Sequence, residues 1–222
     1  MKILAVDTAL GACSVAVLDG DKILANKFVL MDRGHAEALG PMVEEAMRDA
    51  GIGFPALGRI AVTTGPGTFT GQRVGLAFMR GLRVARKKPL IGITTLEGMC
   101  AAALAESNTA NAAAIHDAKR DEAYLAIVSN RKLVMAPELV PLSEAASIIA
   151  NSAAGKIALA GTAAEQISHV LAALHRDAAL TNVRQPDALW VARIALHALA
   201  PDKVPSPLYL RGPDAKLPAA GA

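Results

Sequence analysis

Residues 65–75 read Gly-Pro-Gly-Thr-Phe-Thr-Gly-Gln-Arg-Val-Gly, a composition suited to binding an anion. They follow a strand-like apolar run at 59–64 and precede a helix-like run. A glycine-rich loop at the start of a helix offers free backbone N–H groups and the positive end of the helix dipole. The stretch is not a Walker loop, because no Gly-Lys-Ser/Thr follows, and its G-x-G-x-x-x-G spacing differs from the dinucleotide-binding fingerprint.

Two aspartates could position a metal ion or a phosphate beside such a loop. Asp7 ends the strand-like run 3–7, and Asp117 ends the run 112–117. The alternative, which we favour from the residues alone, is that Asp7 bonds to nearby backbone N–H groups and caps a turn. Only one loop of the phosphate-binding kind is present, so the sequence predicts an incomplete nucleotide cleft.

Metal-dependent and nucleophilic chemistry find little support in the sequence. A helical metal site needs two histidines about one turn apart, but His35 is followed at that spacing by Leu39. The remaining histidines are scattered, so we expect no metal site. There is no G-x-S-x-G motif, and Ser14 lies within a predicted strand.

The elements that position these residues form two similar series. Three opening strands, with a tight Asp-Gly turn between the second and third, are followed by helix, strand, helix, strand and helix. The first series is predicted at 2–7, 12–18, 22–30, 35–50, 59–64, 70–86, 90–93 and 96–106. The second is predicted at 112–117, 123–128, 132–135, 143–151, 156–160, 162–175 and 187–199.

This weak duplication predicts an α/β protein with two lobes, each with a mixed sheet flanked by helices. The predicted boundaries are an N-terminal lobe at 1–106, a smaller C-terminal lobe at 107–200 and a proline-rich tail at 201–222. Pro41 is tolerable only in a first turn, so we expect the helix at 35–50 to start late or to bend there. The tail is expected to be extended and partly disordered beyond Asp214.

Several motifs together resemble one family. A strand ending in aspartate and followed by a hairpin is also how actin-like ATPase and sugar-kinase (ASKHA) domains open. The matching segments are Ile-Leu-Ala-Val-Asp-Thr-Ala at 3–9, Gly-Pro-Gly-Thr-Phe-Thr-Gly at 65–71, Arg-Val-Gly at 73–75, Asp-Ala-Lys-Arg-Asp-Glu-Ala-Tyr at 117–124 and Pro-Leu-Tyr-Leu-Arg at 207–211. They resemble the bacterial TsaB (YeaZ) family over nearly the whole chain.

The resemblance implies an actin-like fold and a non-catalytic role. TsaB proteins are pseudoenzyme relatives of the transferase TsaD, which attaches threonylcarbamoyl to adenosine 37 of tRNAs reading ANN codons. The implied partners are TsaD, the ATPase TsaE and a second TsaB, with tRNA reached through the complex. No cofactor is required by the chain itself, although ATP or ADP could be held at the complex junction. The residues expected near it are Asp7, Thr8, Gly65, Gly67, Thr68 and Thr70.

The partner surface is expected on the two helices at 35–50 and 70–86. Both apolar stripes could pack on their own sheet, and part of each must; the resemblance implies that the outer parts meet the partner. Gly71 and Gly75 could face outward, allowing close helix contact, or inward. The predicted partner-binding residues are Leu39, Met42, Val43, Met47, Gly71, Gln72, Val74, Gly75, Phe78, Met79 and Leu82.

Two positions depart from the family pattern. Gln72 stands where an apolar residue is common, and we expect it to lie on the partner surface and to alter contacts there. Asp121 stands where glycine is usual, and aspartate tolerates a positive φ at some cost.

Composition limits the remaining alternatives. The net charge of +3 permits a nucleic-acid partner without requiring one, and with 3% aromatic residues we expect no base-stacking surface. Cys13 and Cys100 are predicted to be buried hydrophobic residues. No apolar run is long enough for a membrane span or a signal peptide, so we expect a soluble cytoplasmic protein.

Two other functions stay open. One is an actin-like ATPase or small-molecule kinase. The other is a direct tRNA-binding module that would use the basic residues of the second long helix. We favour the simpler interpretation of these residues as a solvated helix end; they are Arg73, Arg80, Arg83, Arg86, Lys87 and Lys88.

Overall fold

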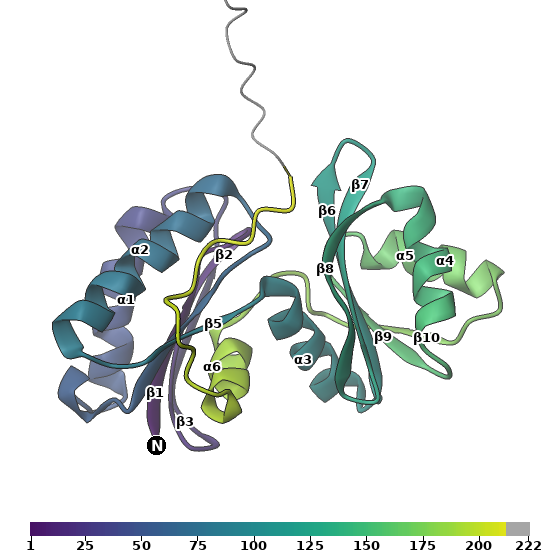
Figure 1. The fold of residues 1–222 in the computed structure, drawn as a ribbon. Helices are drawn as coiled ribbons and strands as arrows, with labels where there is room; N and C mark the ends of the chain where they lie inside the picture. Colours follow the sequence, from purple (N-terminus) through teal and green to yellow (C-terminus); the bar gives the residue numbers. More distant parts are fainter. Residues whose placement is uncertain (212–222) are drawn as a thin grey trace, which may run out of the picture.

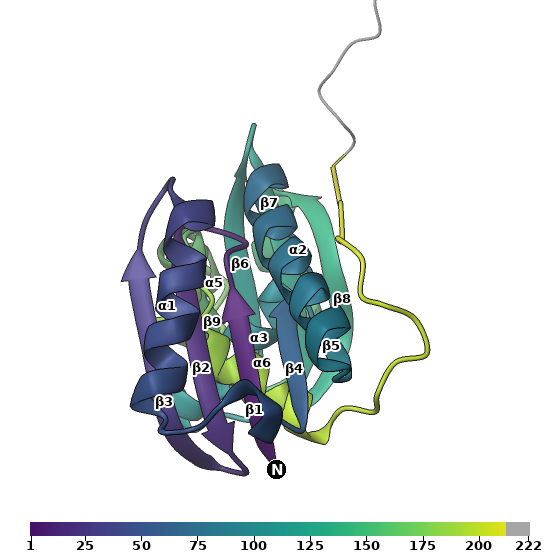
Figure 2. The same cartoon turned by 90° about the vertical axis from the view of Figure 1, so that its left-hand side faces the viewer.

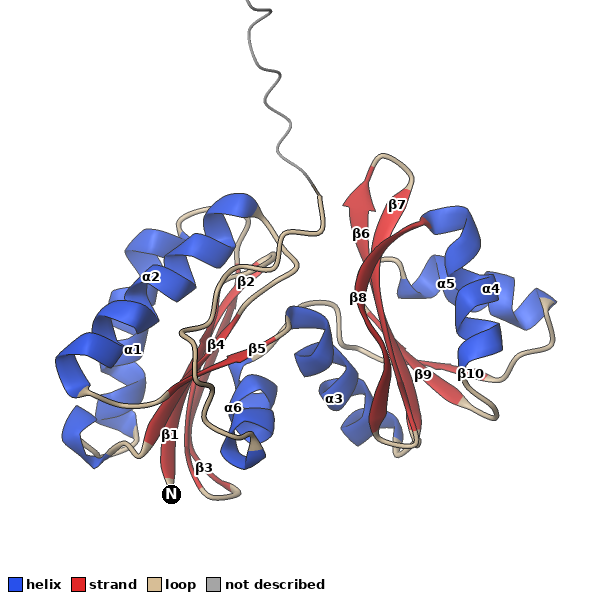
Figure 3. Cartoon of the chain, in the orientation of Figure 1, coloured by secondary structure: helices blue, strands red, loops and turns tan. Residues whose placement is uncertain are grey.

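A computed structural model describes residues 1–211 of the chain. Two five-stranded sheets stand side by side, each with helices on both faces (Figures 1 and 3). The two-lobed α/β arrangement predicted from the sequence is confirmed.

The first sheet has the strand order β3-β2-β1-β4-β5. β1 pairs antiparallel with β2 and parallel with β4, so Asp7 and the loop after β4 come to the same edge of the sheet. The strands are β1 (Lys2–Asp7), β2 (Ala12–Asp19), β3 (Lys22–Leu30), β4 (Arg59–Thr63) and β5 (Leu90–Ile93).

The second sheet repeats this topology in the order β8-β7-β6-β9-β10. β6 pairs antiparallel with β7 and parallel with β9, which makes β6 the counterpart of β1. The strands are β6 (Asn111–Lys119), β7 (Glu122–Ser129), β8 (Lys132–Pro141), β9 (Ile157–Ala160) and β10 (Ala178–Leu180). The sequence analysis missed β10, whose three residues are too few to show a period.

Two helices cover the outer face of each sheet. α1 (His35–Asp49) and α2 (Phe69–Arg86) lie side by side across the first sheet (Figure 2), and a short 3-10 helix η1 (Phe54–Ala56) follows α1. α4 (Leu142–Ser152) and α5 (Ala164–Ala173) cover the second sheet. α1 begins at His35 and continues past Pro41, so the predicted late start is wrong.

The two helices between the sheets are exchanged between the halves of the chain. α3 (Thr95–Ser107) follows β5 but packs on the second sheet, against alanines that allow close approach. α6 (Ala188–His197) follows β10 but packs on the first sheet, where Arg59 donates to its C-terminal carbonyl oxygens of Ala195 and Ala198 at 2.6 and 2.8 Å. The halves at 1–106 and 107–200 therefore each give one helix to the other sheet.

The last described residues form an extended segment, 204–211, which we call the C-terminal strap. Leu208 N–H donates to the Thr64 carbonyl oxygen at 2.7 Å, which fixes the strap to the first lobe. Arg211 donates to the Ala118 carbonyl oxygen at 2.9 Å and pairs with Glu122, which fixes its end to the second lobe. The strap thus joins both lobes (Figure 1). The disorder predicted beyond Asp214 lies outside the described residues.

Candidate functional site

A cleft of about 400 Å³ lies between the lobes, where the loop after β4 faces the end of β6. It brings the first-lobe residues Gly67 and Thr68 opposite Asp117 and Thr162, and therefore joins the two regions that the sequence singled out. Its lining is Leu10, Gly11, Asp32, Gly67, Thr68, His116, Asp117, Ala118, Lys119, Tyr124, Thr162 and Gln185.

Three backbone N–H groups at the start of α2 donate within the protein. Thr68 is the N-cap of α2, and its Oγ1 accepts a hydrogen bond from Gly71 N–H at 3.0 Å. Thr68 N–H donates to the Ala9 carbonyl oxygen at 2.8 Å, and Gln72 N–H donates to the Thr68 carbonyl oxygen at 3.1 Å. These three N–H groups are therefore not directed at the cleft, in contrast to an anion-binding loop.

Glycine is required in this loop because the end of β1 passes very close to it. A Cβ at Gly67 would lie 2.2 Å from the Ala9 carbonyl oxygen, and one at Gly71 would lie 2.2 Å from that of Thr8. Thr8 Oγ1 donates to the Gly71 carbonyl oxygen at 2.7 Å and accepts from Gly75 N–H at 3.0 Å. Gly71 and Gly75 therefore face inward, which corrects their assignment to the partner surface.

Gln72 is also turned inward rather than toward a partner. Its side chain is 2% exposed, and its Nε2 donates to the Gly67 carbonyl oxygen at 2.9 Å. A Cβ at Gly65 would lie 2.5 Å from Gln72 Oε1, so the amide fills the space beneath the loop. Its predicted place on the partner surface is wrong, because this internal hydrogen bond holds the amide under its own loop.

Asp7 is fully buried at the end of β1. Its Oδ1 accepts from Thr63 Oγ1 at 2.5 Å and from Ala9 N–H at 3.3 Å, the turn-capping bond that the sequence analysis favoured. Among the described residues, Oδ2 has no hydrogen-bond partner. Burial, with a smaller contribution from the nearby Asp187 carboxylate, raises the pKa of the Asp7 carboxyl to about 7.

The corresponding end of β6 has a different environment. Asp117 accepts from Lys119 N–H at 2.7 Å and pairs with Lys119 Nζ at 2.9 Å, and these bonds lower the pKa of Asp117. The neighbouring His116 is buried, and burial lowers its pKa to about 4, so the imidazole is neutral at pH 7. In the described part of the chain its Nδ1 has no partner.

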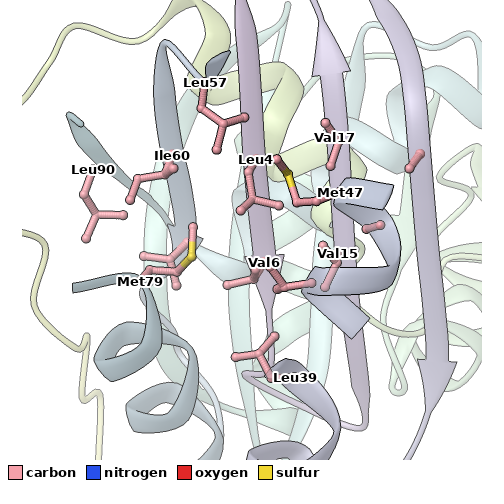
Figure 4. Packing of buried hydrophobic residues seen from close by; sticks show 14 of the residues in the cluster. Leu4, Val6, Val15, Val17, Leu39, Met47, Leu57, Ile60, Met79 and Leu90 are labelled. Carbon is pink, nitrogen blue, oxygen red and sulfur yellow. The ribbon is translucent and has the colours of Figure 1, made fainter. Parts of the chain in front are cut away.

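Four predicted partner-binding residues belong to the hydrophobic core instead. Leu39, Val43, Met47 and Met79 are 0–4% exposed. Figure 4 shows Leu39, Met47 and Met79 packed with Leu4 and Val6 of β1. Their prediction as surface residues is corrected, because both apolar stripes are needed to cover the first sheet. Partly buried side chains that reach the surface between or beside the helices are Met42, Val74, Phe78 and Leu82.

Some structural roles had a weak sequence signal or none. Gln185 Oε1 accepts from Gly11 N–H at 2.9 Å across the cleft, and nothing in its sequence context indicates this. His35 Nε2 lies 3.0 Å from the Leu10 carbonyl oxygen, so this lone histidine is held in the core. Asp121, which stands where glycine is usual, has a positive φ of +57°. Cys13 and Cys100 are buried, as predicted.

Within residues 1–211, no three His, Cys, Asp or Glu side chains are grouped so that they could hold a metal ion. In the same range, the helices are too short or too polar to cross a membrane.

Comparisons with known proteins agree on one family. The model of the TsaD family, tRNA N6-adenosine threonylcarbamoyltransferase, matches residues 23–185. The Escherichia coli tRNA threonylcarbamoyladenosine biosynthesis protein TsaB is 36% identical over 126 residues, which are 57% of this chain and 54% of that protein. The match thus spans about half the length of this curated relative.

Solved structures extend the likeness over the whole fold. Two YeaZ-type structures from Pseudomonas aeruginosa superpose with TM-scores of 0.76 and 0.74, at 26% and 25% identity. They cover 95% and 94% of this chain and 99% of each of those chains. Component A of (R)-2-hydroxyglutaryl-CoA dehydratase from Acidaminococcus fermentans, at TM-score 0.56 and 11% identity, shares the fold alone, over 87% of this chain and 97% of that one.

The fold is therefore the actin-like ATPase and sugar-kinase fold that the opening strands predicted. The family-model match covers most of the chain, and the YeaZ structures superpose over nearly all of it. The chain belongs to the TsaD family, and within it to the TsaB (YeaZ) group of tRNA threonylcarbamoyladenosine biosynthesis proteins.

Proposed function

We propose that this chain is the non-catalytic subunit of the complex that attaches threonylcarbamoyl to adenosine 37 of tRNAs reading ANN codons. In this proposal it binds and activates the TsaD transferase and helps to recruit the TsaE ATPase. It pairs with a second copy when alone. Its likeness to the TsaB proteins supports the pathway, and the geometry of the loop before α2 supports the non-catalytic role.

The observation that carries the non-catalytic role is the internal use of three backbone donors at the start of α2. A phosphate-binding loop needs its N–H groups free, because they replace the water around the anion. Here the N–H groups of Thr68, Gly71 and Gln72 all donate within the protein. Any ATP or ADP at the complex would then be held mainly by the partner, near the exposed Thr68 and Thr70.

The partner surface that fits the burial pattern is the seam between α1 and α2, formed by Met42, Val74, Phe78 and Leu82. These side chains are partly exposed, whereas the fully buried members of the stripes hold the core. Val74→Glu would place a charge in the seam and should abolish pull-down of TsaD. Leu133→Glu is the matched control, because Leu133 is 42% exposed on β8, in the other lobe.

The decisive experiment is threonylcarbamoylation of tRNA in vitro, with TsaD, TsaE and the enzyme that makes the threonylcarbamoyl adenylate. We expect product only when this chain is added, and none from this chain without TsaD. Full activity in its absence would overturn the proposal. Mg-ATP turnover by this chain alone, lost in Asp7→Ala, would indicate a kinase or ATPase instead.

A further inference from the structure

The exposed side of α2 is basic along its whole length. Residues 69–86 contain four arginines and no acidic residue, and Lys87 and Lys88 follow directly. Arg73 and Arg80 are seven residues apart, which puts them on one face of the helix, and Lys87 is its C-cap, so these cationic residues extend over roughly 20 Å. The exposed side of α1 differs, because it carries Glu37 and Glu44.

A groove of about 470 Å³ lies at the C-terminal end of this face. Its lining includes four cationic side chains and no acidic one: Arg83, Lys87, Lys88 and Lys203. Within residues 1–211, no ion pair involves any of the four. A concave surface with charge of one sign concentrates the electrostatic potential and attracts a polyanion. Lys203 comes from just before the strap, so sequence spacing could not have placed it here.

An exposed aromatic pair lies at the other end of the same face. Phe69 and Tyr209 are 57% and 45% exposed, and their ring centroids are 5.7 Å apart in a stacked arrangement. The Arg73 guanidinium carbon lies 3.4 Å from the Phe69 ring centroid. The low aromatic content predicted no stacking surface, but folding brings these two rings together beside the cleft. Such a pair can stack on an unpaired base.

We propose that this face binds an unpaired segment of RNA directly, with phosphates in the basic groove and a base against Phe69 and Tyr209. The stripe is too long for a single phosphate, and it combines charge with exposed aromatic rings as single-strand binding surfaces do. That the RNA is the tRNA substrate rests on the proposed function. The face lies on the strap side of α2, whereas the partner seam lies on the α1 side, so both can be occupied together.

The test measures binding of labelled tRNA to the full chain by fluorescence anisotropy over a range of salt concentrations. Arg83→Glu combined with Lys203→Glu should weaken binding at least 10-fold and reduce the slope of log K against log salt by about 2. Lys22→Glu combined with Lys132→Glu is the matched control, because both lysines are exposed in hairpins away from α2. Equal losses in both double variants, or none in the first, would overturn the proposal.

A second variant tests the aromatic end. Phe69→Ala should weaken binding to an unpaired anticodon-loop RNA by about 5-fold or more, and leave binding to duplex RNA unchanged. Heparin that competes as well as tRNA, at equal charge, would count against RNA recognition. If tRNA binding is unaffected by every variant while threonylcarbamoylation still requires this chain, the RNA surface fails and the proposed function stands. If the variants weaken binding but modification proceeds without the chain, the RNA surface stands and the proposed function fails.

Discussion

The ends of β1 and β6 occupy the same place in two copies of one topology, yet their aspartates behave in opposite ways. Asp7 is fully buried and has a pKa raised to about 7 by burial. Asp117 is partly exposed, and its bonds to Lys119 lower its pKa. The strand position is shared, so the difference comes from the surroundings: Asp7 is enclosed beside Thr63, whereas Asp117 lines the cleft.

The loops after β4 and β9 differ in length but share one requirement. Gly67 and Gly71 pass against the end of β1, and Gly161 passes against the end of β6, where a Cβ would lie 2.0 Å from the Ile115 carbonyl oxygen. Close approach of this loop to the first strand is thus a property of the topology. The extended glycine loop and its N-cap belong to the first lobe alone.

The largest effect is expected where this shared requirement is broken. Gly71→Ala and Gly161→Ala should each reduce the free energy of unfolding by roughly 3 kcal/mol or more, because backbone atoms must move. Gly161 also has φ +105°, so its replacement should cost more. Urea unfolding followed by circular dichroism measures both changes.

Gly81→Ala is the control for this pair. A Cβ there has no described atom within 4 Å, and helix propensity alone should stabilise the protein by about 0.5–1 kcal/mol. Loss of stability in Gly81→Ala, or none in Gly161→Ala, would contradict the packing argument.

A moderate effect is expected on the pH dependence of folding stability, which should differ between Asp7 and Asp117. The folded-state pKa of Asp7 is raised, so the folded protein binds a proton that the unfolded chain releases between about pH 4 and pH 7. Stability should therefore fall as the pH rises through this window. Asp7→Asn should remove that fall and stabilise the protein at pH 8, while keeping the acceptor for Thr63. Thermal unfolding at several pH values measures this.

Asp117→Asn should act in the opposite direction and weakly. The folded-state pKa of Asp117 is lowered, so its contribution is present at neutral pH and is lost as the pH falls through its titration. The pair is partly exposed, so we expect a loss below about 1 kcal/mol at pH 7. Identical pH profiles for the two variants would show that the two environments are equivalent.

The smallest effect concerns the connection between the lobes. Arg211→Ala removes the bonds from the C-terminal strap to Ala118 and Glu122, at an expected cost of about 1 kcal/mol. Hydrogen exchange should increase at the β6–β7 turn and stay unchanged in β1. Tyr209→Phe, which removes only the acceptor of Arg73, is the control and should leave that turn protected.

Periodicity predicted the boundaries of most helices and strands to within a few residues, because strands and amphipathic helices each have a characteristic local spacing of apolar residues. Strand and helix ends at Ile93, Arg86 and Leu30 are as predicted. Which sheet a helix covers depends on contacts distant in sequence, so α6 was grouped with the wrong sheet. The alanines of β6 and β9 gave no sign that α3 packs there.

The site was predicted in part. Asp7, Thr8 and the glycine loop do meet at one sheet edge, because strand ends and parallel pairing are readable from sequence. The orientation of Gly71 and Gly75 stayed open, and Gln72 was placed on the partner surface, because a helical period shows which residues share a face and does not show which face is inside. Gln185 and Lys203 lie beside the first lobe because the chain comes back to it after the second sheet, and no local sequence pattern predicts this path.

Because α3 and α6 are exchanged, each half of the chain needs the other half to cover the inner face of its sheet. A fragment ending near residue 107 would leave the inner face of the first sheet bare, since Ala188, Val191 and Ala195 would be missing. The complementary fragment would lack Leu96 and Met99. Two such fragments expressed together would have reason to assemble, and either one alone would expose apolar surface and aggregate. A single gene encoding both halves therefore keeps their synthesis in equal amounts.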